Sequence, residues 1–348
     1  MTTRREFVGS LAAAVVGARG LRAQGLPAAP TTRPNVGQID RERILRGAAV
    51  AAAASTKRLG PESAEFLALT LSVPALAAAT MVDAANAEKY RAAAEPQLHA
   101  WFVAAETRLV AAPELGEKEF GRVTELCTLG EICVAVPFLG LEDELLASVK
   151  AWFAARLTWL MENRTALLAR DAKDHDGSSW LLQVAAAAKL TGNEAAMSEA
   201  RHRFKTVAIR AQINAEGLFP HDVTTDYPFR NSLFNLDLMG GTCQLLSTQF
   251  ESVWDHELQD GPGMRTAVAK HAYYIRDRVK WPYPADLSHF NLLPCRRPTL
   301  VFAGRAYGNA DYVTLWRGLN ADPTDPDILR SFPIRQPVLW MPNRVQVS

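Results

Sequence analysis

Apolar residues that recur every three or four positions are the feature that most limits how this chain can fold. The segment 141–164 shows the pattern clearly, because its apolar side chains would all lie on one face of a helix: Leu145, Val149, Phe153, Leu157 and Leu160. Segments rich in Ala, Leu, Glu and Arg follow one another with short polar connections, and strand signals are few. The sequence therefore predicts an all-α protein.

We expect roughly ten to twelve helices of ordinary length. They cover residues 40–54, 61–82 with a continuation after 85, 120–136, 141–164, 180–190, 193–215, 231–247, 265–280, 298–306 and 310–319. Residues 113–121 and 261–263 are predicted turns, and residues 332–340 are a predicted extended clasp at the C-terminus. Antiparallel helix pairs of this kind can close into an α/α toroid, an incomplete α/α barrel.

The N-terminus has the composition of an export signal. Arg4 and Arg5 precede a short apolar run and an Ala-rich stretch that reaches Ala23. This order is typical of a twin-arginine signal and predicts a periplasmic or secreted protein. We expect the signal at 1–23, a linker at 24–39 and one α/α domain at 40–348. The apolar run is too short to span a bilayer, so we expect no stable membrane insertion after signal removal.

Composition limits the partners of the chain. The 38 basic and 37 acidic residues leave a net charge of +1, so there is no basic excess to bind nucleic acid, although a local basic groove for an acidic glycan is compatible with it. The cysteines match no zinc-site spacing and lie in apolar surroundings, which favours buried free thiols: Cys127, Cys133, Cys243 and Cys295. We expect no cofactor, and the sequence leaves a divalent cation open.

Residues able to do chemistry gather in one stretch, 174–235. Two polar segments in it lead into apolar helices, one before the run 180–190 and one before the run 231–247. The polar candidates are Asp174, His175, Asp176, His221, Asp222, Asp226, Tyr227, Arg230 and Asn231. The rest of the chain has the pattern of a helical scaffold, so we expect any active site here.

The motifs of this stretch resemble those of the alginate lyase family, α/α-toroid polysaccharide lyases that cut uronic-acid glycans by β-elimination. Family members carry Asn-Asn-His-Gly, an aromatic residue and Gln-Val-Ala-Ala; this chain has Asp174-His175-Asp176-Gly177, Trp180 and Gln183-Val184-Ala185-Ala186. Members also carry an acidic residue, an Arg-Thr pair, Pro and Tyr-Ser-x-Phe-Asn-Leu. Here the matching residues are Asp222, Thr225-Asp226, Pro228 and Asn231-Ser232-Leu233-Phe234-Asn235-Leu236.

The resemblance implies catalytic positions that this chain fills with other residue types. The family's catalytic His falls on Asp176, its Asn on His175, its Arg on Thr225 and its Tyr on Asn231. A shift of one residue would place His175 in the His role. Tyr227 and Arg230, from the same loop, can replace the Tyr and the Arg.

Cleavage of a uronide by β-elimination requires a group that neutralises the carboxylate, a base for the C5 proton and an acid for the leaving oxygen. We expect Arg230 and Asn231 to neutralise the carboxylate. Tyr227 and His175 are the expected base and acid, and Asp176 is a further catalytic candidate. The expected substrate-binding residues are Asp174, Trp180, His221 and Asp222.

The aspartates of the stretch leave three interpretations open, because unpaired carboxylates in a cleft would repel a polyanion. They can pair with Arg230, Lys173 and their neighbours, hold a divalent cation, or act as acid and base in glycoside hydrolysis. Asp174 or Asp176 also suits the N-cap of the following helix.

The leading prediction is an exported lyase acting on an acidic polysaccharide of the alginate or glucuronan type. The alternatives are an inactive relative that binds a glycan and a hydrolase that uses the aspartates.

Overall fold

The computed structural model describes residues 35–53 and 64–341, all within one compact unit, Arg33–Ser348. Over these ranges there are helices but no β-strand, and two isolated bridges join Glu257 to Gly263 and Cys295 to Asn320. The all-α prediction is confirmed.

Five helices form an inner row in which each packs against the next in chain order. They are α3 (Ala64–Val82), α6 (Leu129–Ala135), α9 (His175–Thr191), α12 (Pro228–Leu246) and α14 (Pro298–Ala306). Sixteen of the 19 residues of α12 are buried, because α9, α13 (Met264–Arg276) and α14 all pack against it.

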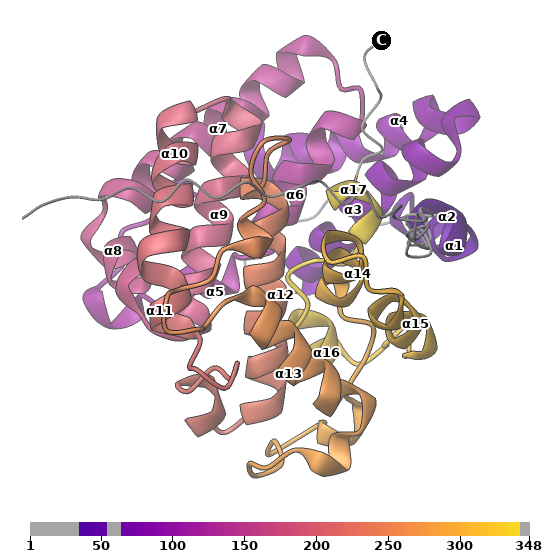
Figure 1. The fold of residues 1–348 in the computed structure, drawn as a ribbon. Coiled ribbons are helices and arrows are strands. Elements are labelled where there is room, and N and C mark those ends of the chain that lie inside the picture. The colour runs from indigo at the N-terminus through magenta and orange to yellow at the C-terminus, as the bar shows by residue number, and fades with distance from the viewer. Residues whose placement is uncertain (1–34, 54–63, 342–348) are drawn as a thin grey trace, which may run out of the picture. The chain divides into compact units, whose positions relative to one another are not determined.

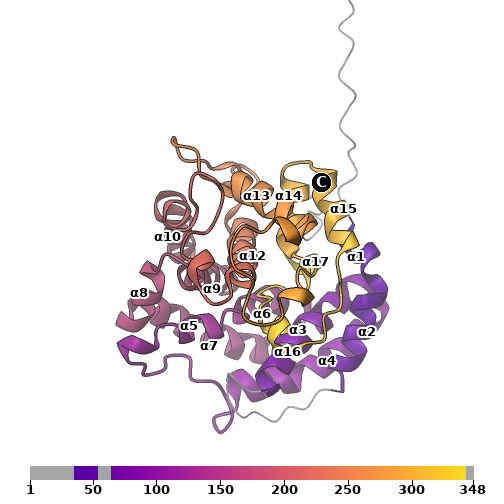
Figure 2. The same ribbon diagram turned by 90° about the horizontal axis from the view of Figure 1, so that it is seen from below.

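An outer row packs against this inner row (Figures 1 and 2). It consists of α2 (Arg41–Ala51), α4 (Ala87–Leu98), α7 (Asp143–Glu162), α10 (Glu194–Arg203), α13 (Met264–Arg276) and α15 (Ala310–Gly318). The two rows of antiparallel pairs form the incomplete α/α toroid that the sequence predicted.

Shorter elements connect the two rows. The α-helical ones are α1 (Val36–Ile39), α5 (Arg122–Glu125), α8 (Arg164–Asp171), α11 (Ile209–Gln212), α16 (Pro326–Arg330) and α17 (Pro337–Trp340). The 3₁₀ and π turns are η1 (Ala84–Asn86), η2 (His99–Val103), η3 (Glu117–Glu119), η4 (Val136–Phe138), η5 (Phe204–Ala208), η6 (Asp222–Thr224), η7 (Val253–Asp255), η8 (Arg278–Lys280) and η9 (Phe290–Leu292).

Several expected boundaries were wrong. The helix expected from residue 180 begins at His175, because the Asp174 side chain caps it by accepting the backbone N–H of Asp176 at 3.0 Å. The expected helix 193–215 is divided by the π turn η5, and the expected helix 120–136 is divided into α5 and α6. The expected linker 24–39 reached too far, since Val36 is buried in α1.

The segment from α16 to α17, residues 326–340, is here called the C-terminal strap. Its last four residues are helical rather than extended, and α17 contacts the inner helices α3, α6, α12 and α14. The buried carboxylate of Glu131 accepts the backbone N–H groups of Arg335 and Gln336 at 2.8 and 2.7 Å. The strap is therefore anchored to α6 across the centre of the inner row.

The helix α3 is long and apolar enough to cross a membrane by length and composition alone, with a mean hydropathy of 1.7. However, 61% of that window is buried inside the protein, where α3 packs against α2, α4 and α6. A central position in the core accounts for its apolar composition.

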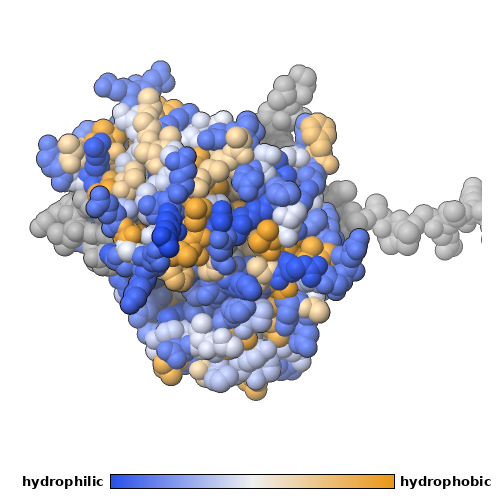
Figure 3. All heavy atoms as spheres, turned by 90° about the vertical axis from the view of Figure 1, so that its left-hand side faces the viewer, coloured by the Kyte–Doolittle hydropathy of each residue, from blue (hydrophilic) through white to orange (hydrophobic). Residues whose placement is uncertain are grey.

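The outer surface is more polar than the core helices. On the face seen in Figure 3, which includes α8 and α10, hydrophobic residues form small patches separated by hydrophilic ones.

All four cysteines are free and buried, as the sequence predicted. The predicted signal at 1–23 and most of the predicted linker lie outside the described residues.

A fully buried ion pair joins α12 to the start of α14. The Asp237 carboxylate accepts from Arg297 Nη1 at 3.3 Å and from the backbone N–H of Thr299 at 3.2 Å. Arg297 also donates to the Ser331 carbonyl of the strap at 3.2 Å. Burial raises the pKa of Asp237 to about 6 although Arg297 opposes the shift. The pair therefore links three segments in the core.

We predict that Asp237→Ala lowers the free energy of unfolding by about 3–5 kcal/mol, because it leaves the Arg297 charge buried without its partner. Urea unfolding followed by circular dichroism measures the change. The control is Asp260→Ala, which breaks the exposed pair with Arg210 and should leave stability close to that of the unaltered protein. Equal losses in both variants would contradict the structural role of the buried pair.

Candidate functional site

A cleft of about 740 Å³ lies where α9 and α12 begin. The two helices, with the N-cap Tyr227 of α12, contribute one side, and α3 and α5 form the opposite side. The residues of the first side are His175, Asp176, Tyr227, Arg230, Asn231 and Phe234. The strap adds Asp327, Arg330, Ser331 and Arg335. The cleft thus brings together all five residues that we expected to be catalytic.

The start of α9 is shaped by two local features. Asp174 caps α9, so His175 and Asp176 are the first two residues of the helix, and both side chains line the cleft. A Cβ atom at Gly177 would meet the backbone carbonyl oxygen of Ala172, so this turn can pack closely only with glycine.

A buried carboxylate holds His175. Asp222 is fully buried, and its Oδ1 lies 2.7 Å from His175 Nδ1 and accepts the His175 backbone N–H at 3.3 Å. Its Oδ2 accepts from Asn235 Nδ2 at 2.6 Å, and the same amide donates to Gln212. We assign the proton to Nδ1, because Asp222 is an acceptor, which leaves Nε2 for a substrate.

Two opposing effects act on the pKa of His175. Burial is the larger single effect and lowers it, but the hydrogen bond and charge of Asp222, together with Asp176 and Asp174, raise it above its ordinary value. The imidazole beside this carboxylate is placed to accept and to donate a proton.

Asp176 lines the cleft beside His175. Its Oδ1 lies 4.0 Å from His175 Nε2 and accepts a short hydrogen bond from the Thr124 hydroxyl of α5. Burial raises the pKa of Asp176, while Thr124 and His175 oppose the shift. A carboxylate here stabilises a protonated His175.

The first turns of α12 supply the other polar groups. The Arg230 guanidinium lies over the Tyr227 ring, 3.7 Å from its centroid. Asn231 Nδ2 donates to the Thr225 hydroxyl at 3.1 Å, which donates in turn to the Asp222 carbonyl at 2.8 Å. No carboxylate of the described residues lies within ion-pair distance of the Arg230 guanidinium. Its charge is thus available to an anionic ligand.

The strap brings two cations that the sequence analysis missed. Arg335 donates to the carbonyls of Thr70 and Leu329 at 3.2 and 3.1 Å, and the exposed Arg330 pairs with Asp327 at 3.0 Å. The sequence offered one signal for Arg335, which is that this charged residue stands inside an otherwise apolar C-terminal segment.

None of the four expected substrate-binding residues lines the cleft. Trp180 is buried in the core, where Nε1 donates to the Leu160 carbonyl at 2.8 Å. His221 is exposed outside the cleft. Asp174 caps α9, and the buried Asp222 hydrogen-bonds to His175. Both residues therefore hold His175 in position instead of contacting a ligand in the cleft.

The aspartates do not form the metal group that one interpretation required. Of Asp174, Asp176, Asp222 and Asp226, Asp176 alone lines the cleft. In the described part of the chain, the group with suitable spacing consists of His289, Asp325 and Asp327, whose ligand atoms lie within 4.8 Å of one another. Asp325 caps α16 and Asp327 pairs with Arg330, so both carboxylates already have structural partners.

Comparison with protein-family models matches the alginate lyase model to residues 57–281, about two-thirds of the chain. The chain belongs to the alginate lyase family. A solved structure of an alginate lyase from Bacteroides ovatus superposes with a TM-score of 0.72 at 16% identity, covering 87% of this chain and 93% of that chain. This likeness supports the shared fold. Comparison with curated proteins finds no match.

This member of the alginate lyase family departs from the catalytic pattern that the resemblance implied. Thr225 and Asn231, at the positions of the expected Arg and Tyr, hydrogen-bond each other and support the loop around Asp222. Tyr227 and Arg230 reach the cleft from nearby positions of the same loop and helix.

We predict that Asp222→Asn lowers the pKa of His175, because it removes the negative charge that raises it. Since the folded-state pKa of His175 is raised, its stabilising contribution is present below the unfolded value and is lost as pH rises through the folded value. At pH values below the unfolded-state pKa of His175, Asp222→Asn should lower the free energy of unfolding by about 1.5–3 kcal/mol, the contribution of a hydrogen bond to a charged group.

Histidine NMR titration and urea unfolding at several pH values measure both effects. His221→Gln identifies the exposed histidine resonance and should leave the other titrations unchanged. An unchanged His175 pKa in Asp222→Asn would contradict the assigned pairing.

Proposed function

We propose that this chain is an exported polysaccharide lyase that cleaves a uronic-acid glycan of the alginate or glucuronan type by β-elimination. One observation carries the proposal: a histidine held by a buried carboxylate and an arginine without a carboxylate partner among the described residues line the same cleft. Each uronic acid carries a carboxylate that Arg230 can bind. Membership of the alginate lyase family supports the substrate class.

The proposed reaction uses the residues as follows. Arg230 and Asn231 bind the substrate carboxylate and so make the C5 proton more acidic. His175 Nε2 takes that proton, and Asp176, 4.0 Å away, stabilises the resulting imidazolium. The electron pair forms the C4–C5 double bond as the C4–O bond breaks, and Tyr227 donates a proton to the leaving oxygen.

Two other functions have weaker support. Replacement of all four family catalytic residue types favours an inactive glycan-binding relative. Hydrolysis by two of the loop aspartates requires two carboxyl groups at the cleft, and Asp176 is the one of the four that lines it.

We predict that the purified protein produces an unsaturated uronide, seen as a rise in ultraviolet absorbance, with one of a panel of alginates, glucuronans and related uronides. His175→Ala and Tyr227→Phe should each lower the rate about 10²–10⁴-fold, because each removes a proton-transfer group. Arg230→Gln should chiefly raise KM, because it weakens binding of the carboxylate.

The matched control is His221→Ala, since His221 is an exposed histidine outside the cleft and its loss should leave the rate unchanged. Binding without a new double bond would instead support the inactive relative. New reducing ends without a double bond would support the hydrolase. Full activity in both His175→Ala and Tyr227→Phe would refute the assigned roles.

We also propose export through the twin-arginine route, on the basis of Arg4 and Arg5 before the apolar run. The double replacement Arg4→Lys and Arg5→Lys should keep the precursor in the cytoplasm, measured by cell fractionation. Arg19→Lys, beyond the apolar run, is the control. Unchanged arrival of the double variant outside the cytoplasm would argue against this route.

A further inference from the structure

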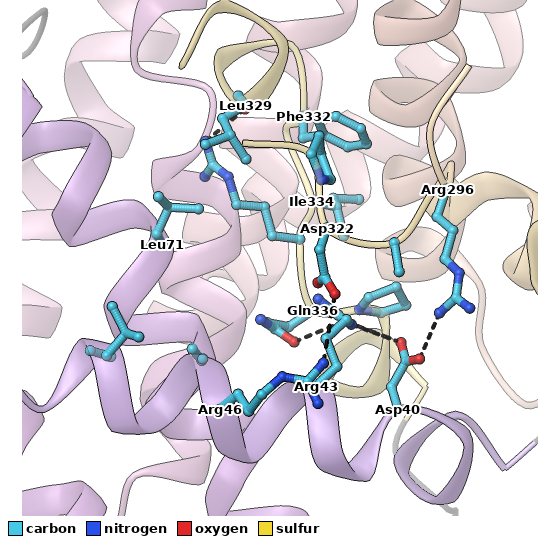
Figure 4. A pocket seen from close by; sticks show the side chains of 18 of the residues that line it. Asp40, Arg43, Arg46, Leu71, Arg296, Asp322, Leu329, Phe332, Ile334 and Gln336 are labelled. Atoms are coloured by element: carbon cyan, nitrogen blue, oxygen red, sulfur yellow. Dashed lines mark hydrogen bonds and ion pairs between the residues drawn. The ribbon is translucent and has the colours of Figure 1, made fainter. Parts of the chain in front are cut away.

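A second cavity, of about 730 Å³, lies between α2, α3, α15 and the strap (Figure 4). It is distinct from the cleft, because α3 turns different residues to each: Ala68, Leu71 and Ala75 line this cavity, whereas Phe66, Leu67 and Thr70 line the cleft. Arg335 borders both. Its hydrogen bonds to Thr70 and Leu329 place it in the wall between them.

One end of the cavity is charged. Asp40 is buried and held by Arg43 at 3.1 Å and by Arg296 at 2.7 Å, so its charge is already compensated. Arg46 reaches Asp322 at 3.7 Å, and both side chains are mostly exposed. At this end three arginines face two aspartates, which leaves an excess of one positive charge: Arg43, Arg46 and Arg296 against Asp40 and Asp322.

Gln336 adds a hydrogen-bond donor to this end of the cavity. The residue is 6% exposed, and its Oε1 accepts from Arg43 Nη2 at 3.4 Å. Its Nε2 has no hydrogen-bond partner among the described residues, although the side chain lines the cavity. Because this nitrogen is not among the buried unpaired atoms, it is open to solvent and can donate to a ligand in the cavity.

The other end is mostly aliphatic, and the Arg335 guanidinium lies in its wall beside Leu329. Figure 4 shows Leu71 and Leu329 away from the charged group around Asp40 and Arg46, and Ile334 also lines the cavity. The two aromatic residues of the lining offer no open ring face on which a sugar could stack. Trp316 and Phe332 are 1% and 6% exposed, and guanidinium groups already lie over their rings, Arg296 at 4.6 Å and Arg297 at 4.1 Å.

Most of the lining is also outside the part of the chain that matches the family model. Residues 40–51 and 296–337 supply the charged end and most of the apolar end, whereas the matched residues are 57–281.

We propose that this cavity binds a carboxylate with an aliphatic chain, such as a medium-chain fatty acid. The carboxylate meets Arg46 and the free amide of Gln336, and the chain lies along Leu71, Leu329 and Ile334. A cavity of this size, mostly apolar with a few polar groups at one end, suits a small amphipathic ligand. The aliphatic walls and covered aromatic rings argue against a glycan.

The test is isothermal titration calorimetry of the whole protein with octanoate, octanol and acetate. We expect octanoate to bind at least about tenfold more tightly than octanol, which lacks the charge, and than acetate, which lacks the chain. Equal binding of octanoate and octanol would overturn the role of the charged end, and equal binding of octanoate and acetate would overturn that of the apolar end.

Variants locate the site. Arg46→Gln should weaken octanoate binding about tenfold, and Ala68→Phe, which fills the cavity, should abolish it. The control Arg41→Gln lies on the same helix but outside the cavity lining and should bind normally. Because Arg46 is exposed, its replacement keeps the fold, so unchanged binding in Arg46→Gln, or loss of binding in His175→Ala at the cleft, would refute the proposal.

Discussion

The site depends on the fully buried carboxylate of Asp222. One of its oxygens faces His175 at the start of α9, and the other accepts from Asn235 in α12. A carboxylate in the core without such partners would be strongly destabilising. The same interaction therefore orients the imidazole and joins the inner helices α9 and α12, so the candidate active site is part of the core rather than an addition to its surface.

The strap is the second constraint, because it completes both cavities. The buried Glu131 holds its backbone, and the Arg335 guanidinium lies against α3 between the cleft and the second cavity. Burial raises the pKa of Glu131, whereas the positive charge of Arg335 and the backbone N–H groups oppose the shift. Residues more than 200 positions apart in the chain thus determine the shape and charge of both cavities.

Sequence reasoning predicted most helices but not all their ends, since caps and tertiary packing decide where a helix begins. The three- and four-residue spacing of apolar residues identified α7. The first turn of α9 was missed because residues His175 to Ser179 are mostly polar. Trp180 was expected at the substrate because it lies beside polar residues. Its position in α9 instead directs it into the core, where its indole N–H finds the Leu160 carbonyl.

The sequence alone determined the all-α class, the toroid of helix pairs and the stretch that holds His175, Asp176, Tyr227, Arg230 and Asn231, because helical periodicity and local motifs are properties of neighbouring residues. Tertiary structure alone separated Asp222 as a buried support from Asp176 at the cleft, and brought Arg335 into its wall. These assignments depend on contacts between distant segments, and local spacing carries no information about which carboxylate is buried.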